Sequence, residues 1–176
     1  MEIKCPMDHP IKRVNLEDLE QLQRLALNSG RLRANHNLHS EPHDLIQRFF
    51  NAMEPGSYIR PHRHFDPPKW ELLLVVRGSG VVLLFNEDGS VQERLELNPR
   101  RQNLAVEVPA ARWHTLAALA PSTIFFELKP GPYLPLLDKD FAPWASQEGT
   151  EQAKAIESWF HQAYPGERFS IPSSER

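Results

Sequence analysis

The chain has 176 residues, of which 40% are hydrophobic and 24% are charged, with 20 basic against 23 acidic side chains. This length predicts a single domain, residues 1–176, that buries about 70% of the surface of its unfolded chain. The net charge of −3 lacks the basic excess of nucleic-acid-binding proteins, and no apolar run approaches the roughly 20 residues of a membrane helix. Cys5 is the only cysteine, which excludes an internal disulfide and a cysteine-based zinc site.

The N-terminal segment, residues 1–43, is predicted to be helix followed by loop. Its first ten residues contain acids and prolines where a secretory signal needs an apolar stretch, so we expect a cytoplasmic protein. Asn15 is a suitable cap for a helix over 16–28, where apolar residues recur near helical spacing, and Gly30 ends the pattern. The polar stretch 31–43 is interpreted as an ordered loop.

Residues 44–129 have the pattern of a β-barrel. Short apolar runs separated by Pro or Gly turns predict strands over 46–53, 71–76, 81–86, 91–97 and 124–128. Several short strands at this spacing are typical of an all-β sandwich or barrel. The runs Leu72–Val76 and Val81–Phe85 are apolar throughout, so we expect both to be buried on both faces, under a covering helix or in a homodimer.

The C-terminal segment, residues 130–176, is predicted to cross the barrel surface and then to form a helix. Its first residues are rich in proline. Thr150 is a suitable cap for a helix over 151–163, and Pro165 and Gly166 end it.

Four side chains of metal-ligand type stand at informative places. His62 and His64 are separated by one residue, so on a strand they face the same side about 6.5 Å apart and can share one ion. Glu71 opens the next predicted strand, and His114 stands where a later strand begins. Three imidazoles and a carboxylate suit Fe, Mn, Ni, Cu or Zn. A His-x-His pair alone is a weak signal, because two histidines with satisfied hydrogen bonds are the commoner explanation.

This arrangement resembles the cupin family. The first cupin motif is a Gly, five residues, His-x-His, three or four residues, a Glu, six residues and a Gly, and it is matched by Gly56, His62, His64, Glu71 and Gly78. In the second motif Pro109 and His114 match, whereas Asn103, Ala111 and Ala118 replace two glycines and an asparagine.

The cupin resemblance implies a mainly β fold, with a jelly-roll (double-stranded β-helix) barrel carrying an N-terminal and a C-terminal helix. It also implies that one divalent first-row transition metal ion is held by His62, His64, Glu71 and His114.

The sequence departs from the family pattern at two places. Six residues separate His64 from Glu71, and because an even insertion preserves the facing of side chains, we favour Glu71 as the ligand, with Asp66 as a rival carboxylate. Ala111 stands where the second motif has a glycine. Since alanine adopts a positive φ only at a cost, we expect the turn there to avoid φ > 0.

A narrower resemblance, to the WbuC family of cupin metalloproteins, covers about residues 30–150. It is carried by residues 33–39, 47–48, 58–64, 113–114, 127–133 and 141–145. Members of that family are found among polysaccharide-biosynthesis genes, and no reaction is firmly assigned to them. The resemblance therefore implies a fold, a metal and a link to polysaccharide biosynthesis, but no substrate.

Three further side chains, Arg60, Tyr58 and Arg48, are candidates for binding a substrate beside the metal. Arg60 and Tyr58 share the parity of His62 and His64, so a strand that extends backward would turn both toward the cavity. An inward arginine near a cation needs a balancing anion, either a ligand or a glutamate such as Glu127 or Glu71. On the early strand one of Gln47 and Arg48 faces inward, and Arg48 is favoured.

Two functional hypotheses follow. The first is a metal-dependent enzyme, of isomerase, epimerase or dioxygenase type, acting on a small anionic or carbohydrate-type substrate. The alternative is a non-catalytic, metal-dependent module that binds or senses carbohydrate. A metal-free epimerase-like cupin is disfavoured, because four ligand-type residues would then be coincidental. The expected partners are a small anionic or sugar-like ligand and, in a homodimer, a second copy, without nucleic acid or membrane.

Overall fold

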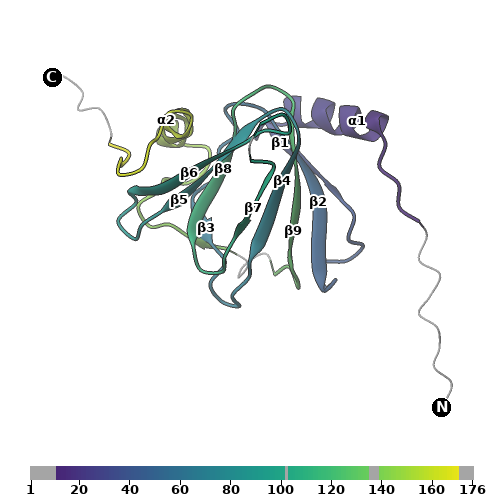
Figure 1. Cartoon of the computed structure of the whole chain (residues 1–176), viewed down its shortest axis with the longest axis horizontal. Helices are drawn as coiled ribbons and strands as arrows, with labels where there is room; N and C mark the ends of the chain where they lie inside the picture. The colour runs from purple at the N-terminus through teal and green to yellow at the C-terminus, as the bar shows by residue number, and fades with distance from the viewer. Residues whose placement is uncertain (1–10, 102, 135–138, 171–176) are drawn as a thin grey trace, which may run out of the picture.

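The computed structural model describes residues 11–101, 103–134 and 139–170 as two five-stranded antiparallel sheets that face each other, with one helix at each side (Figure 1). The first sheet has the order β1 (Arg33–Asn37), β2 (Ile46–Met53), β9 (Thr123–Pro130), β4 (Glu71–Arg77) and β7 (Ala105–Val108). The second has the order β10 (Asp140–Phe141), β3 (His62–Arg63), β8 (Trp113–Ala118), β5 (Gly80–Phe85) and β6 (Val91–Leu97). The mainly β prediction is confirmed. Cys5 and the outer parts of both terminal segments lie outside the described residues.

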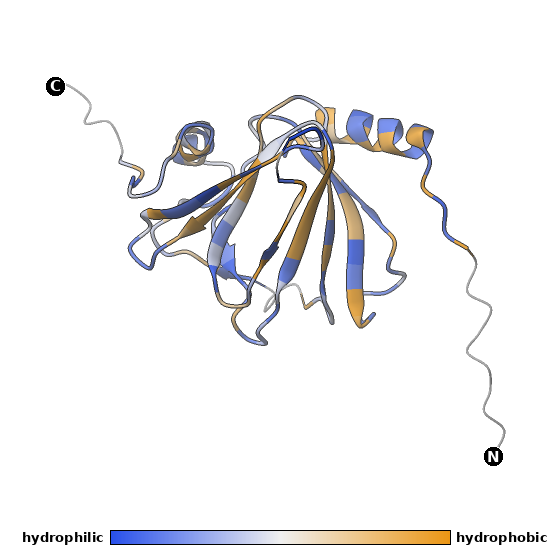
Figure 2. Cartoon of the chain, viewed as in Figure 1, coloured by the Kyte–Doolittle hydropathy of each residue, from blue (hydrophilic) through white to orange (hydrophobic). Residues whose placement is uncertain are grey.

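Helix α1 (Leu16–Leu27) begins at the predicted cap. The Asn15 side chain accepts a hydrogen bond from the Asp18 backbone N–H at 3.0 Å, and the Asp18 carboxylate accepts one from the Asn15 N–H at 2.8 Å. The buried face of α1 packs on the outer side of the first sheet, against Ala52 and Ile124. The hydrophobic and hydrophilic stripes of the helix are visible in Figure 2.

Strand β1 corrects the sequence analysis, which interpreted residues 31–43 as a loop. Residues 33–37 pair with β2 along the edge of the first sheet, from Arg33 opposite Met53 to Asn37 opposite Phe49. The strand is polar because it is an edge strand covered on only one face, where Ala34 contacts the α1 cluster. It therefore lacks the alternation of apolar residues from which strands are predicted.

The apolar strands β4 and β5 differ in their burial. All residues of β5 are buried, because Val82 and Leu84 face the barrel core while Val81, Leu83 and Phe85 lie under helix α2 (Glu151–Phe160). The covering helix predicted for this strand is present. On β4 only the inward residues are buried, and Leu72 and Leu74 are half-buried, so the expectation of burial on both faces is wrong there.

The turn before β8 also corrects the sequence analysis. Ala111 has φ = +65°, the left-handed conformation that the glycine of the cupin pattern would adopt without strain. Its backbone N–H donates to the carbonyl of His64 at 3.0 Å. The turn therefore keeps the glycine geometry with an alanine, and this hydrogen bond ties it to the segment that carries the histidines.

Replacing Ala111 with glycine is expected to stabilise the protein. Left-handed backbone costs a residue with a Cβ about 1–2 kcal/mol, while glycine costs roughly 0.4–1 kcal/mol more unfolded-chain entropy, so the free energy of unfolding should rise by up to about 1 kcal/mol in urea denaturation. Ala110→Gly is the matched control, because Ala110 has no positive φ and should lose stability. A loss of stability in Ala111→Gly would contradict the strain.

Candidate metal centre

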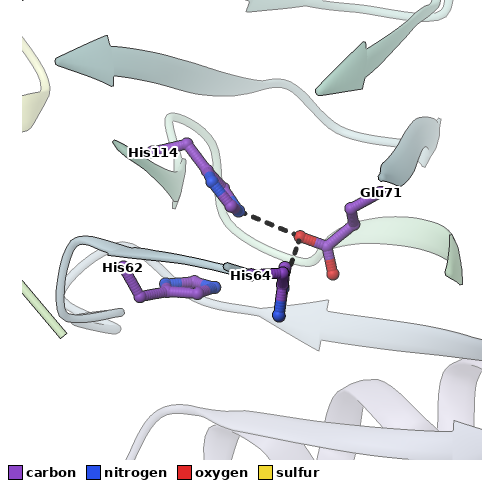
Figure 3. A group of neighbouring side chains, drawn as sticks. All are labelled: His62, His64, Glu71 and His114. Carbon is purple, nitrogen blue, oxygen red and sulfur yellow. Dashed lines mark hydrogen bonds and ion pairs between the residues drawn. The ribbon is translucent and has the colours of Figure 1, made fainter. Parts of the chain in front are cut away.

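The structure brings the four predicted ligands together inside the barrel (Figure 3). His62 lies on β3, His64 directly follows it, and His114 lies on β8 in register with His62. Glu71 opens β4 in the opposite sheet. One candidate ligand atom from each residue lies within 4.8 Å of the others, and all four residues are buried. The predicted rival, Asp66, is exposed and is not part of this cluster.

Two imidazoles are held in an orientation and tautomer that suit a metal ligand. Nδ1 of His62 lies 3.0 Å from the carbonyl of Arg60, and Nδ1 of His114 lies 2.8 Å from the carbonyl of Arg112. Because a carbonyl only accepts, each Nδ1 must donate, which leaves the lone pair of a neutral ring on Nε2. A backbone carbonyl on Nδ1 is also the usual partner of a metal-bound histidine.

The facing atoms repel unless a proton or a metal ion lies between them. Glu71 Oε2 is 3.1 Å from Nε2 of His114 and 3.7 Å from Nε2 of His64. A lone pair and a carboxylate oxygen this close require a second ring proton or a metal ion. Nε2 of His62 is also buried and has no hydrogen-bond partner among the described residues. A buried nitrogen of this kind fits a metal ligand, so the residues present fit the implied ion.

Electrostatics favour the ligand forms of Glu71 and His62. Burial alone would raise the pKa of Glu71, but Lys129, with Nζ 3.8 Å from Oε1, and the neighbouring imidazoles outweigh it and hold this pKa well below the usual range. Burial lowers the pKa of His62 well below its usual value. At neutral pH Glu71 is therefore a carboxylate and His62 is a neutral imidazole.

A second buried carboxyl, Glu127 on β9, lies near the cluster. Its Oε1 accepts a hydrogen bond from the Asn51 side chain at 2.6 Å, and burial, helped by the charge of Glu71, raises the pKa of Glu127 to about 7. From the sequence, Glu127 was expected only as a partner for Arg60 or as part of the WbuC-like pattern. The two-residue period of Phe125, Glu127 and Lys129, all of which are buried, is the signal that would have placed it inside the barrel.

The substrate-binding candidates Arg60 and Tyr58 lie before β3, which begins only at His62, so strand parity does not extend to them. Arg60 donates to the carbonyl of Ala142 at 3.0 Å. The Tyr58 hydroxyl donates to the carbonyl of Ser146 at 2.9 Å, its ring packs in the α2 cluster, and burial raises its pKa. Contact of either residue with a ligand stays a prediction.

The inward orientation favoured for Arg48 is wrong. Gln47 is buried and shares the parity of the inward Phe49 and Asn51, whereas the side chain of Arg48 is 43% exposed and lies 3.6 Å from Asp44. A strand with polar residues at adjacent positions has no clear phase in its sequence, and the packing of its aromatic neighbours decides it.

In the metal-free protein, the stability of the Glu127→Gln variant relative to the parent is expected to increase as the pH rises. The folded-state pKa, about 7, lies above the unfolded value, so the parent loses stability as the pH rises from about 4.5 through 7, while the variant has no proton to lose. From pH 5 to pH 8, the free energy of unfolding of the variant minus that of the parent should rise by about 1–3 kcal/mol. Urea denaturation with a chelator present measures both values. A difference independent of pH would contradict the raised pKa.

Comparisons with known proteins agree with this architecture. A family model described as a domain of unknown function (DUF6016) matches residues 14–97, and no curated protein matches the chain. Protein SO0799 from Shewanella oneidensis, 12% identical, is similar over 74% of this chain and 87% of its own with a TM-score of 0.52. Salicylate 1,2-dioxygenase from Pseudaminobacter salicylatoxidans, 13% identical, is similar over 68% of this chain, but this chain spans only 34% of that protein, with a TM-score of 0.50.

A cupin superfamily protein (DSY2733) from Desulfitobacterium hafniense is 16% identical over 71% of this chain and 92% of its own, with a TM-score of 0.44. These matches do not test the narrower WbuC resemblance, which stays a prediction.

No helix among the described residues is long and apolar enough to cross a membrane. The similarity to SO0799 and to salicylate 1,2-dioxygenase shows a shared fold, and the two facing antiparallel sheets agree with the jelly-roll barrel that the cupin resemblance implies.

Proposed function

We propose that the chain binds one divalent first-row transition metal ion and acts as a metal-dependent enzyme on a small anionic, carbohydrate-type substrate. His62, His64, Glu71 and His114 would hold the ion. The observation that carries the proposal is the buried cluster whose Nε2 lone pairs and carboxylate oxygen face one another. An ion bound there would act as a Lewis acid toward an oxygen of the substrate.

The charges around the cluster support an anionic substrate. Lys129 is buried, at 5% exposure, and its Nζ lies 3.8 Å from Oε1 of Glu71. A divalent ion together with Lys129 would bring more positive charge to the cluster than Glu71 and Glu127 bring negative charge, even when both are ionised. Buried charge is costly unless it is compensated, so the interior favours a ligand that brings negative charge.

Two reaction classes fit an anionic ligand on such a centre, namely isomerisation or epimerisation and oxygen-dependent oxidation. The shared fold of salicylate 1,2-dioxygenase does not choose between them, because 13% identity shows the fold alone. The proposed link to polysaccharide biosynthesis, and with it the choice of sugar-type ligands, rests on the WbuC resemblance.

One observation favours the alternative, a non-catalytic binding module. The cluster spans the barrel, since Glu71 belongs to the first sheet and His62 and His114 belong to the second. An ion there would join the two sheets and stabilise the fold, whether or not it catalyses a reaction.

Replacing Glu71 with glutamine is expected to remove high-affinity metal binding. The protein, purified without a metal-affinity tag, should bind one equivalent of metal by elemental analysis and gain about 2.7 kcal/mol of stability at 100 times the dissociation constant. Glu71→Gln should weaken binding by more than the roughly 10–100-fold typical of changes outside the ligand set. Glu107→Gln, an exposed glutamate on β7, is the matched control and should bind as the parent does. Equal affinity in Glu71→Gln and the parent would refute the ligand set.

Turnover separates the enzyme from the module. The metal-loaded parent is incubated with hexuronic acids and sugar nucleotides, with products followed by NMR and oxygen uptake by an electrode. An enzyme forms product in the parent and in Glu107→Gln but not in Glu71→Gln, and only an oxidation consumes oxygen. Binding of these ligands by the loaded parent without any product would identify a module and overturn the enzyme proposal.

A further inference from the structure

A buried polar pair lies next to the metal cluster and plays no part in holding the ion. Glu127 stands opposite Phe49 on β2 and opposite Leu73 on β4, two residues from Glu71 on the same face. Glu127 and Glu71 are therefore diagonal neighbours on the inner face of one sheet, a relation that corresponds to about 7–8 Å. Asn51 adds its amide to this position by donating to Oε1 of Glu127 at 2.6 Å.

The side-chain oxygen of Asn51 is an acceptor without a donor. The residue is only 4% exposed, and Oδ1 has no hydrogen-bond partner among the described residues. Of the side chains that stand in register with this pair, Phe49, Leu73 and Phe125 have no hydrogen-bond donor, and the amide of Asn35 on β1 makes no hydrogen bond to Oδ1. Oδ1 can therefore accept a hydrogen bond from a water or from a bound ligand.

The orientation of the pair suits a ligand that already contacts the metal. Asn51 and Glu127 are buried in the same barrel interior as Glu71, and Glu127 is the nearer of the two along the sheet. The Asn51 amide occupies one oxygen of Glu127 and turns its own Oδ1 away from that bond. The two residues thus offer an amide acceptor and a carboxyl acceptor on the inner face of the first sheet, with Glu127 one diagonal step from Glu71 and Asn51 one step farther.

We propose that Asn51 and Glu127 form a subsite that accepts hydrogen bonds from adjacent hydroxyl groups of the metal-bound ligand. This makes a polyhydroxylated acid, such as a uronic acid, the substrate class: its carboxylate meets the positive charge of the centre, and its hydroxyls meet the two acceptors. The inference rests on the proposed function, because the metal and Lys129 place the carboxylate. A site built to bind hydroxyls rejects an analogue that lacks them, since its buried acceptors would stay unpaired.

The test compares two probes of equal charge and ring size, D-glucuronate and cyclohexanecarboxylate, by calorimetric titration of the metal-loaded protein. The parent should bind D-glucuronate at least about 10-fold more tightly. Asn51→Leu, which keeps a similar volume, should lose this preference and retain its metal. If Asn51→Leu does not fold, Glu127→Gln serves as a second variant, because its shape is nearly unchanged. It is also expected to lose at least half of the preference for D-glucuronate.

Asn103→Ala is the control, because Asn103 is an exposed asparagine that precedes β7, at the end of β4 distant from Glu71. It should keep the preference of the parent. Equal binding of both acids by the metal-loaded parent overturns the subsite, leaves the metal proposal standing and assigns the Asn51 acceptor to a buried water. A preference that survives in both Asn51→Leu and Glu127→Gln overturns it too. Absence of metal from the parent shows instead that the proposed function has failed.

Discussion

The arrangement of this protein depends on one electrostatic constraint, a buried carboxylate on one sheet that faces imidazole lone pairs on the other. Glu71 enters from β4, whereas His62 and His114 pair directly across β3 and β8. Without a metal ion or a second ring proton these groups repel, and burial from water makes the repulsion expensive. Backbone hydrogen bonds hold the histidines in this arrangement. Nδ1 of His62 and of His114 each donates to a carbonyl, and the N–H of Ala111 donates to the carbonyl of His64.

The barrel interior is divided along its length. Strands β4 and β9 of the first sheet change from apolar to polar toward the metal cluster, as Val75 and Leu73 give way to Glu71 and Phe125 gives way to Glu127 and Lys129. The apolar part packs with the second sheet around Leu84, Leu116 and Phe125. Stability therefore comes from one half of the interior, and the other half is free to hold charged groups that a packed core would exclude.

The sequence predicted the parts of the fold that have strong local signals. Both helix caps, the apolar strands and the clustering of the four candidate ligands follow from spacing and from the cupin resemblance. The edge strand β1 was missed because half of its surface faces solvent and gives no apolar alternation. The prediction that Ala111 avoids a positive φ was wrong, because the hydrogen bond from its N–H to His64 holds the turn in the left-handed conformation. The Asn51–Glu127 pair required the register of β2 with β9, which composition does not encode.

The ligand set itself is tested most directly by X-ray absorption spectroscopy of the metal-loaded protein. The account predicts a single site with three imidazole nitrogens and one carboxylate oxygen at about 2.0–2.2 Å, for a zinc-like ion, and the loss of the oxygen scatterer with one coordination position when Glu71 is replaced. A spectrum with fewer than three imidazoles, or one that is identical in Glu71→Gln, would contradict it.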